Sequence, residues 1–101
     1  MSQFLDLPGA SGARYRFRRA ELDALPVMGG NLVVAQPHPS GPRLFWCAPA
    51  ESLAQARPAA AAALKGRAGA AVYVRLNVAR ATREAEHADL TAAAEALAEP
   101  A

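Results

Sequence analysis

The fold is decided by two adjoining segments, AAVYVRLNV at residues 70–78 and ATREAEHADLTAAAEALAEP at residues 81–100. The first segment is the most apolar run in the chain and predicts a strand of a sheet. In the second, the i, i+3, i+4, i+7 spacing of a buried helical face occurs at Leu90, Ala93, Ala94 and Leu97. Thr82 is placed to cap this helix. Because the stripe contains small residues, we expect the helix to approach the sheet closely.

Three earlier segments predict further strands. Residues 13–18 alternate between aromatic residues and arginines, which is typical of a half-buried strand with Tyr15 and Phe17 facing inward. Residues 32–35 form a short, continuously apolar run that indicates a buried strand. The loop at residues 37–42 contains three prolines and cannot continue a ladder, so residues 43–47 are predicted to return as the second strand of a hairpin.

Short helices are expected between these strands. Residues 19–25 have room for about two helical turns before Pro26 ends them. Residues 50–56 and 58–65 predict two more helices, with Gly66 just past the end. Taken together, the pattern predicts a single α+β domain over residues 1–101, with a small antiparallel sheet of three to four strands flanked by helices.

Composition limits the classes of protein that fit the chain. Its charge is +6 over residues 1–80 and −4 over residues 81–101. A basic body can bind a polyanion, but a solvated surface with internal ion pairs explains the same numbers. The single Cys47 excludes an internal disulfide framework, and we expect an inert core thiol. We recognise neither a secretory signal nor an apolar run long enough for a membrane span, which predicts a cytoplasmic location and no membrane partner.

Four ordered pieces of the chain resemble a known family. They are LPGASGARYRF at residues 7–17, GNLVV at residues 30–34, LFWCAPAESL at residues 44–53 and REAEHADL at residues 83–90. In this order they are similar to small, stand-alone bacterial GIY-YIG nuclease-like domains. The resemblance covers nearly the whole chain. It implies a metal-dependent endonuclease that uses two signature tyrosines, a helix arginine and a glutamate that holds Mg²⁺.

The positions that would carry this chemistry are replaced. The two tyrosine positions align with Val33 and Trp46, neither of which offers an acceptor oxygen. The metal glutamate aligns with His87, an imidazole poorly suited to Mg²⁺. The nearest helix arginine, Arg57, is displaced by one residue. The resemblance therefore implies a catalytically degenerate domain with no catalytic residues, no metal site and no cofactor, and Mg²⁺ would be needed only if nuclease activity survived.

Basic residues on the predicted strands are the remaining binding candidates, because arginine binds phosphate bidentately and stacks on bases. They are Arg14, Arg16, Arg18, Arg19, Arg43 and Arg75. Tyr15 and Phe17 face the other way and cannot stack with the ligands of these arginines. His38, in the proline-rich loop, is interpreted as a solvated residue.

Three hypotheses follow. The first is a non-enzymatic domain that binds the phosphate backbone of DNA or RNA weakly through its arginines. The second is a protein-interaction or structural module with no nucleic-acid partner, such as a homodimer through an exposed sheet edge. The third is a residual nuclease that uses Tyr15 or Tyr73.

Overall fold

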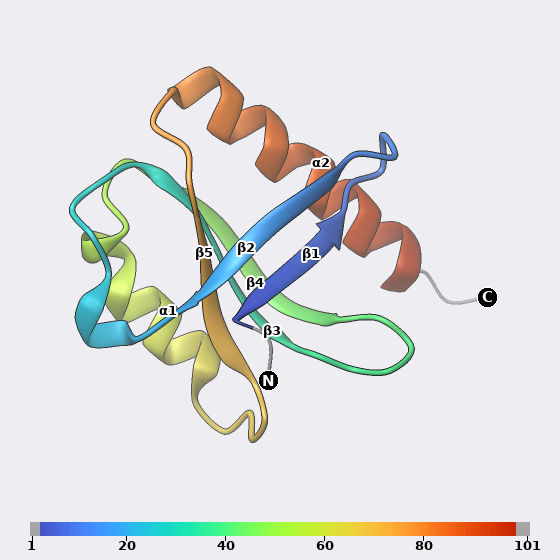
Figure 1. Cartoon of the computed structure of the whole chain (residues 1–101), viewed down its shortest axis with the longest axis horizontal. Helices are drawn as coiled ribbons and strands as arrows, with labels where there is room; N and C mark the ends of the chain where they lie inside the picture. Colours follow the sequence, from blue (N-terminus) through green and yellow to red (C-terminus); the bar gives the residue numbers. More distant parts are fainter. Residues whose placement is uncertain (1–2, 99–101) are drawn as a thin grey trace.

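The computed structural model describes residues 3–98, which form one five-stranded sheet and four helical segments. The strands are β1 (Phe4–Pro8), β2 (Arg14–Ala20), β3 (Gly30–Gln36), β4 (Arg43–Ala50) and β5 (Ala71–Leu76). The helical segments are η1 (Leu22–Ala24), η2 (Ala54–Ala56), α1 (Arg57–Leu64) and α2 (Arg80–Ala98). The strand order is β1-β2-β5-β3-β4, and all pairs are antiparallel (Figure 1). The predicted α+β class is therefore confirmed.

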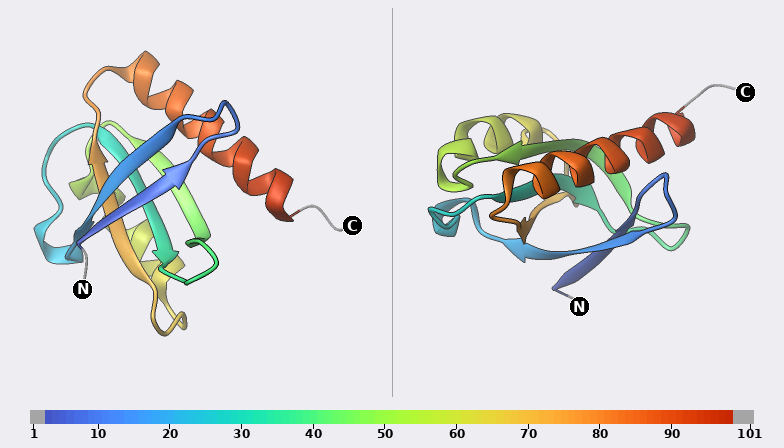
Figure 2. Two further views of the ribbon diagram at one scale, coloured as in Figure 1. Left: turned by 45° about the vertical axis from the view of Figure 1, so that its right-hand side comes forward. Right: turned by 90° about the horizontal axis from the view of Figure 1, so that it is seen from above.

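The sheet curls so that the β1–β2 hairpin lies in front of β3 and β4 (Figures 1 and 2). The enclosed space is filled by one core cluster, which includes Leu7, Phe17, Val33, Tyr73 and Leu90. Since β1 and β4 are the two edge strands, the curl leaves an open side between them. Helix α2 contacts both strands and closes that side.

A second cluster packs on the opposite face of β3 and β5, beneath α1. It includes Leu25, Leu32, Leu53, Ala60 and Val72. Strand β3 supplies buried residues to both clusters, so every position from Gly30 to Ala35 is buried. This explains why the sequence there is continuously apolar instead of alternating.

The strand β1 was not predicted, and the sheet has five strands instead of three to four. Leu5 and Leu7 face the core from this strand, while Phe4 and Pro8 are exposed. Five residues with only two buried positions are too short a pattern to distinguish from a loop. What holds the segment in a strand is its register with β2, where Leu5 lies opposite Phe17 and Leu7 opposite Tyr15.

Two predicted helices are wrong in extent. Residues 19–25 begin as the end of β2, because Arg19 and Ala20 pair with Tyr73 and Val72 of β5, and a helix forms only in η1. Residues 50–56 contain only η2, because β4 continues through Pro49 to Ala50 opposite β3. In both cases pairing with a neighbouring strand overrides local helical preference.

The later elements agree more closely with the prediction. Helix α1 ends before Gly66, whose φ of +76° is the left-handed conformation expected past a helix end. Helix α2 begins at Arg80, so Thr82 lies inside the first turn and is not its N-cap. Leu90 is buried as predicted, whereas the side chain of Leu97 lies outside the described part of the chain. Within residues 3–98, neither α-helix is long and apolar enough to cross a membrane.

Candidate functional site

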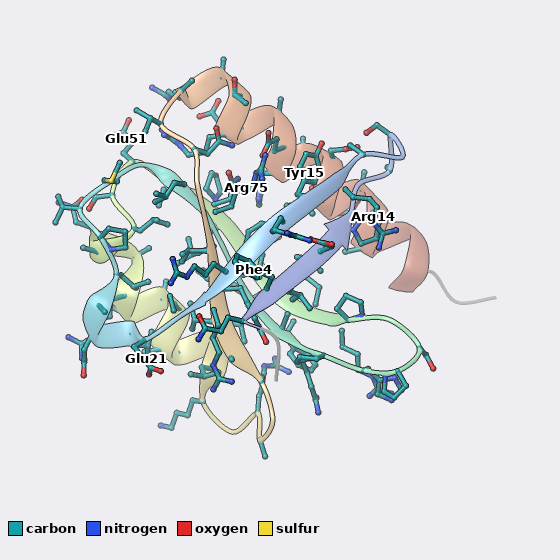
Figure 3. The ribbon with its side chains drawn as sticks, viewed as in Figure 1. Phe4, Arg14, Tyr15, Glu21, Glu51 and Arg75 are labelled. Carbon is teal, nitrogen blue, oxygen red and sulfur yellow. The ribbon has the colours of Figure 1, made fainter. Side chains whose placement is uncertain are left out.

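Alternation along β2 places three arginines on the outer surface of the curled sheet. Phe17 is fully buried and Tyr15 half-buried toward the core, as predicted, so Arg14, Arg16 and Arg18 point into solvent. The register with β1 places Phe4 directly opposite Arg18 on the same outer face. We call Phe4, Arg14, Arg16 and Arg18 the arginine face. Figure 3 shows Phe4 and Arg14 on the front of the hairpin.

One of these arginines is held by its neighbours on β1. Arg16 Nε donates to Asp6 Oδ1 at 3.0 Å, and its guanidinium lies 5.2 Å from the centre of the Phe4 ring. The hydrogen bond from Arg16 lowers the pKa of Asp6 below its ordinary value. Among the described residues, neither Arg14 nor Arg18 has a carboxylate within salt-bridge distance. The arginine face therefore carries two guanidinium groups, those of Arg14 and Arg18, that form no ion pair with any carboxylate of the described residues.

A groove of about 650 Å³ runs beside this face, between the hairpin and the segment that follows η1. Its apolar lining includes Phe4, Val74 and Leu76, and Arg16 and Arg18 border it. Phe4 is 50% exposed and Leu76 56% exposed, so apolar surface is open to solvent here. Glu21 is the one carboxylate among the described lining residues.

The other three predicted arginines do not belong to this face. Arg75 points to α2, where its Nε donates to Glu86 Oε1 at 2.8 Å and its guanidinium stacks on the Tyr15 ring at 5.5 Å (Figure 3). Arg43 lies on the edge strand β4, beside a separate depression that Pro8 and Leu90 also line. Arg19 is exposed at the end of β2, next to the groove. The predicted set of six therefore divides into three arginines on the outer face and three at other positions, of which Arg19 and Arg75 also line the groove.

The four degenerate signature positions are not brought together as one site. Val33 is fully buried in the cluster inside the curl, whereas Trp46 packs against the cluster beneath α1. His87 is half-buried on α2. Arg57 forms an ion pair with Asp23 and so connects α1 to η1. Hydrophobic packing and one ion pair account for three of the four positions.

A polar cluster that the sequence did not suggest connects the β1–β2 turn to α2. The Asp89 carboxylate accepts hydrogen bonds from the Ser11 backbone N–H at 2.8 Å, the Ser11 hydroxyl at 2.6 Å and the Tyr15 hydroxyl at 2.7 Å. These bonds lower the pKa of Asp89, with the Ser11 hydroxyl as the largest cause, and the bond to Asp89 raises the pKa of Tyr15. A Cβ at Gly9 would overlap the Asp89 carboxylate, so this approach requires glycine.

The cluster gives the motif at residues 7–17 a structural explanation. Gly9 leaves room for the carboxylate, and Ser11 and Tyr15 bind it. The signal that could have found the cluster is the pairing of this motif with the aspartate in REAEHADL, although nothing in the sequence says that the two segments meet.

A second hydrogen-bond network lies between the end of β5 and the first turns of α2. Arg83 is only 4% exposed, and its Nη1 donates to the carbonyl oxygens of Asn77 and Val78, both at 3.1 Å. The Asn31 side-chain amide donates to the Arg83 carbonyl at 3.0 Å. Asn77 Nδ2 donates to Asn31 and to Glu86, each at 3.0 Å. No carboxylate of the described residues lies within salt-bridge distance of Arg83, and both hydrogen bonds of its Nη1 go to carbonyl oxygens.

Within residues 3–98, no group of three or more His, Cys, Asp or Glu side chains is placed to hold a metal ion. Cys47 is partly buried, and burial raises the pKa of its thiol, which makes it a poor nucleophile. His38 is an exposed loop residue whose Nδ1 accepts a hydrogen bond from the Ser40 backbone N–H.

Comparison of the chain with protein-family models, with curated proteins and with solved structures found no significant match.

Proposed function

We propose that this chain is a non-enzymatic, GIY-YIG-like domain that binds nucleic acid through phosphate contacts on the arginine face. The observation that carries the proposal is the pair of exposed arginines, Arg14 and Arg18, which face solvent from one strand and form no ion pair within residues 3–98. A guanidinium fits a phosphate bidentately, and a phosphate would give each of these two arginines an ion-pair partner.

The geometry of the strand supports a repeating ligand. Residues two apart on a strand are separated by roughly 6.5–7 Å, so Arg14, Arg16 and Arg18 form a row of equally spaced cations. A row of this kind suits a polymer of phosphates better than a single small anion.

The proposal excludes catalysis as the main role. Val33 and Trp46, which align with the signature tyrosines, cannot accept or shuttle a proton, and they belong to two different hydrophobic clusters. Tyr15 is engaged with Asp89, and Tyr73 is buried in the core, so neither is a good substitute for a signature tyrosine.

Salt dependence tests the proposal. The logarithm of the binding constant for a labelled, single-stranded 20-nucleotide DNA should fall linearly with the logarithm of salt concentration. Each phosphate contact should contribute about −0.7 to the slope. The Arg14→Gln and Arg18→Gln double variant should reduce the slope by about 1.4 units, because two contacts are lost.

Lys65→Gln is the matched control. It removes the same kind of charge from an exposed position after α1, away from the arginine face, and should leave the slope unchanged. Absent binding, or binding that does not respond to salt, would contradict the proposal.

The second candidate is a protein-interaction module, and one observation favours it. Val27, Met28, Leu76 and Val78 are large apolar side chains exposed near one end of the sheet, where the Asn77 backbone N–H donates to Gly29. If nucleic acid fails to bind, sedimentation of the protein at increasing concentration tests self-association through this apolar end. A monomer at all concentrations would count against a homodimer.

A further inference from the structure

We propose that the ligand of the arginine face is a single-stranded nucleic acid, with one base held in the groove against Phe4. This inference rests on the proposed function and makes it more specific. It follows from the aromatic and apolar surface next to the arginines. A ligand recognised only by its phosphates would not need that surface.

The first step concerns the aromatic ring. Phe4 is on the same outer face as Arg16 and Arg18, and half of its surface is exposed. Tyr15 and Phe17 cannot take this role because they face the core. Base stacking on an aromatic side chain is worth about 1–3 kcal/mol per base and tolerates any sequence.

The second step concerns what surrounds the ring. Arg16 stacks on Phe4, and a guanidinium plane can stack on a base as well as bind a phosphate. Val74 and Leu76 continue the apolar surface along the groove. A base that entered the groove would exchange water contacts for apolar ones, while its own phosphates stayed beside Arg16 and Arg18.

The third step distinguishes one strand from two. In a duplex the bases are stacked on one another and paired, so their flat faces are not available to Phe4. A single strand presents unstacked bases, and it extends so that neighbouring phosphates have about the spacing of alternate residues on a strand, roughly 6.5–7 Å. The row of arginines on β2 matches this extended form.

The experiment compares four probes of twelve units at one salt concentration by fluorescence anisotropy. They are single-stranded DNA, single-stranded RNA, duplex DNA and an abasic strand that has the phosphates but no bases. We expect at least one of the two single strands that contain bases to bind about tenfold or more tightly than the duplex and the abasic strand, which is consistent with one stacked base.

Phe4→Leu and Phe4→Tyr are the matched variants. Phe4→Leu keeps apolar area but removes the ring, and it should weaken single-strand binding about 5- to 100-fold without changing duplex binding. Phe4→Tyr should retain the affinity of the wild type. Because Phe4 is on an edge strand, the Tm of each variant is measured first. If Phe4→Tyr loses single-strand binding as Phe4→Leu does, the result would contradict a stacking role for the ring.

Failure of this inference is distinguishable from failure of the proposed function. Equal binding of single strands, duplex and abasic strand, with no effect of Phe4→Leu, would overturn the single-strand inference and leave phosphate binding intact. No binding of any probe would overturn both.

Discussion

Arg83 shows how one buried charge is accommodated at the residue scale. Its Nη1 donates to two backbone carbonyls in the loop that precedes α2, and the guanidinium has no carboxylate partner among the described residues. Gly29 packs closely against it, since a Cβ there would collide with Nη1. Arg83 therefore binds the loop between β5 and α2 to the helix and packs against the loop that precedes β3.

Replacing Arg83 tests this role. Arg83→Ala should destabilise the fold by about 1–3 kcal/mol, because the carbonyls of Asn77 and Val78 lose their donor in a mostly buried place. Urea denaturation gives the free energy of unfolding. Thr82→Ala is the control: Thr82 is exposed and is not the N-cap, so its loss should change the free energy by less than about 0.5 kcal/mol. A loss of about 1 kcal/mol or more from Thr82→Ala would restore the capping role and contradict the observed helix start.

At the element scale, the fold depends on how the β1–β2 hairpin is attached to α2. Asp89 binds both Ser11 and Tyr15 across 78 and 74 positions of sequence, and the Ala10 backbone N–H donates to the Asp89 carbonyl oxygen at 3.1 Å. This attachment holds the outer hairpin, and with it the arginine face, in a fixed position over the core.

The attachment should depend on pH. The folded pKa of Asp89 is lowered, so the stabilisation that it provides is present above its unfolded pKa, about 4, and is lost as pH falls through the folded pKa. The difference in Tm between the wild type and Asp89→Asn should therefore be several degrees at neutral pH and should shrink below about pH 4.

Glu84→Gln serves as the comparison for this titration. Among the described residues Glu84 is paired with Arg80 alone, on the exposed surface of α2, and a pair of this kind contributes little. Its Tm should stay close to that of the wild type at every pH. A Tm difference between the wild type and Asp89→Asn that is constant with pH would show that the Asp89 charge is not the source of the stabilisation.

At the scale of the whole molecule, the curl of the sheet sets the order of local stability. Strands β3 and β5 are internal and contribute to both hydrophobic clusters, whereas β1 and β4 are edges. Val33, Val34, Val72 and Tyr73 lie on strands that are paired on both sides, and all four side chains are buried in one of the two clusters.

Hydrogen exchange followed by NMR checks this order. The amides of β3 and β5 should exchange only through global unfolding, with the largest protection in the molecule, while hydrogen-bonded amides of β1 should exchange at least about tenfold faster through local opening. Equal protection in β1 and β5 would mean that the hairpin and the central strands unfold as one unit, and that the arginine face is as rigid as the core.

The sequence alone determined the class of the fold and most of its elements. Period-two alternation at residues 13–18, the apolar run at residues 32–35 and the stripe around Leu90 are local consequences of which side chains must leave water, so they can be recognised without a partner segment. The same alternation identified the outward-facing Arg14, Arg16 and Arg18. Only the tertiary structure decided the rest. It made Phe4–Pro8 a strand, extended β4 through Pro49, separated Val33 from Trp46 and placed Phe4 beside the arginines. These features depend on pairing and packing between distant segments, and the free energy of such contacts belongs to neither segment by itself.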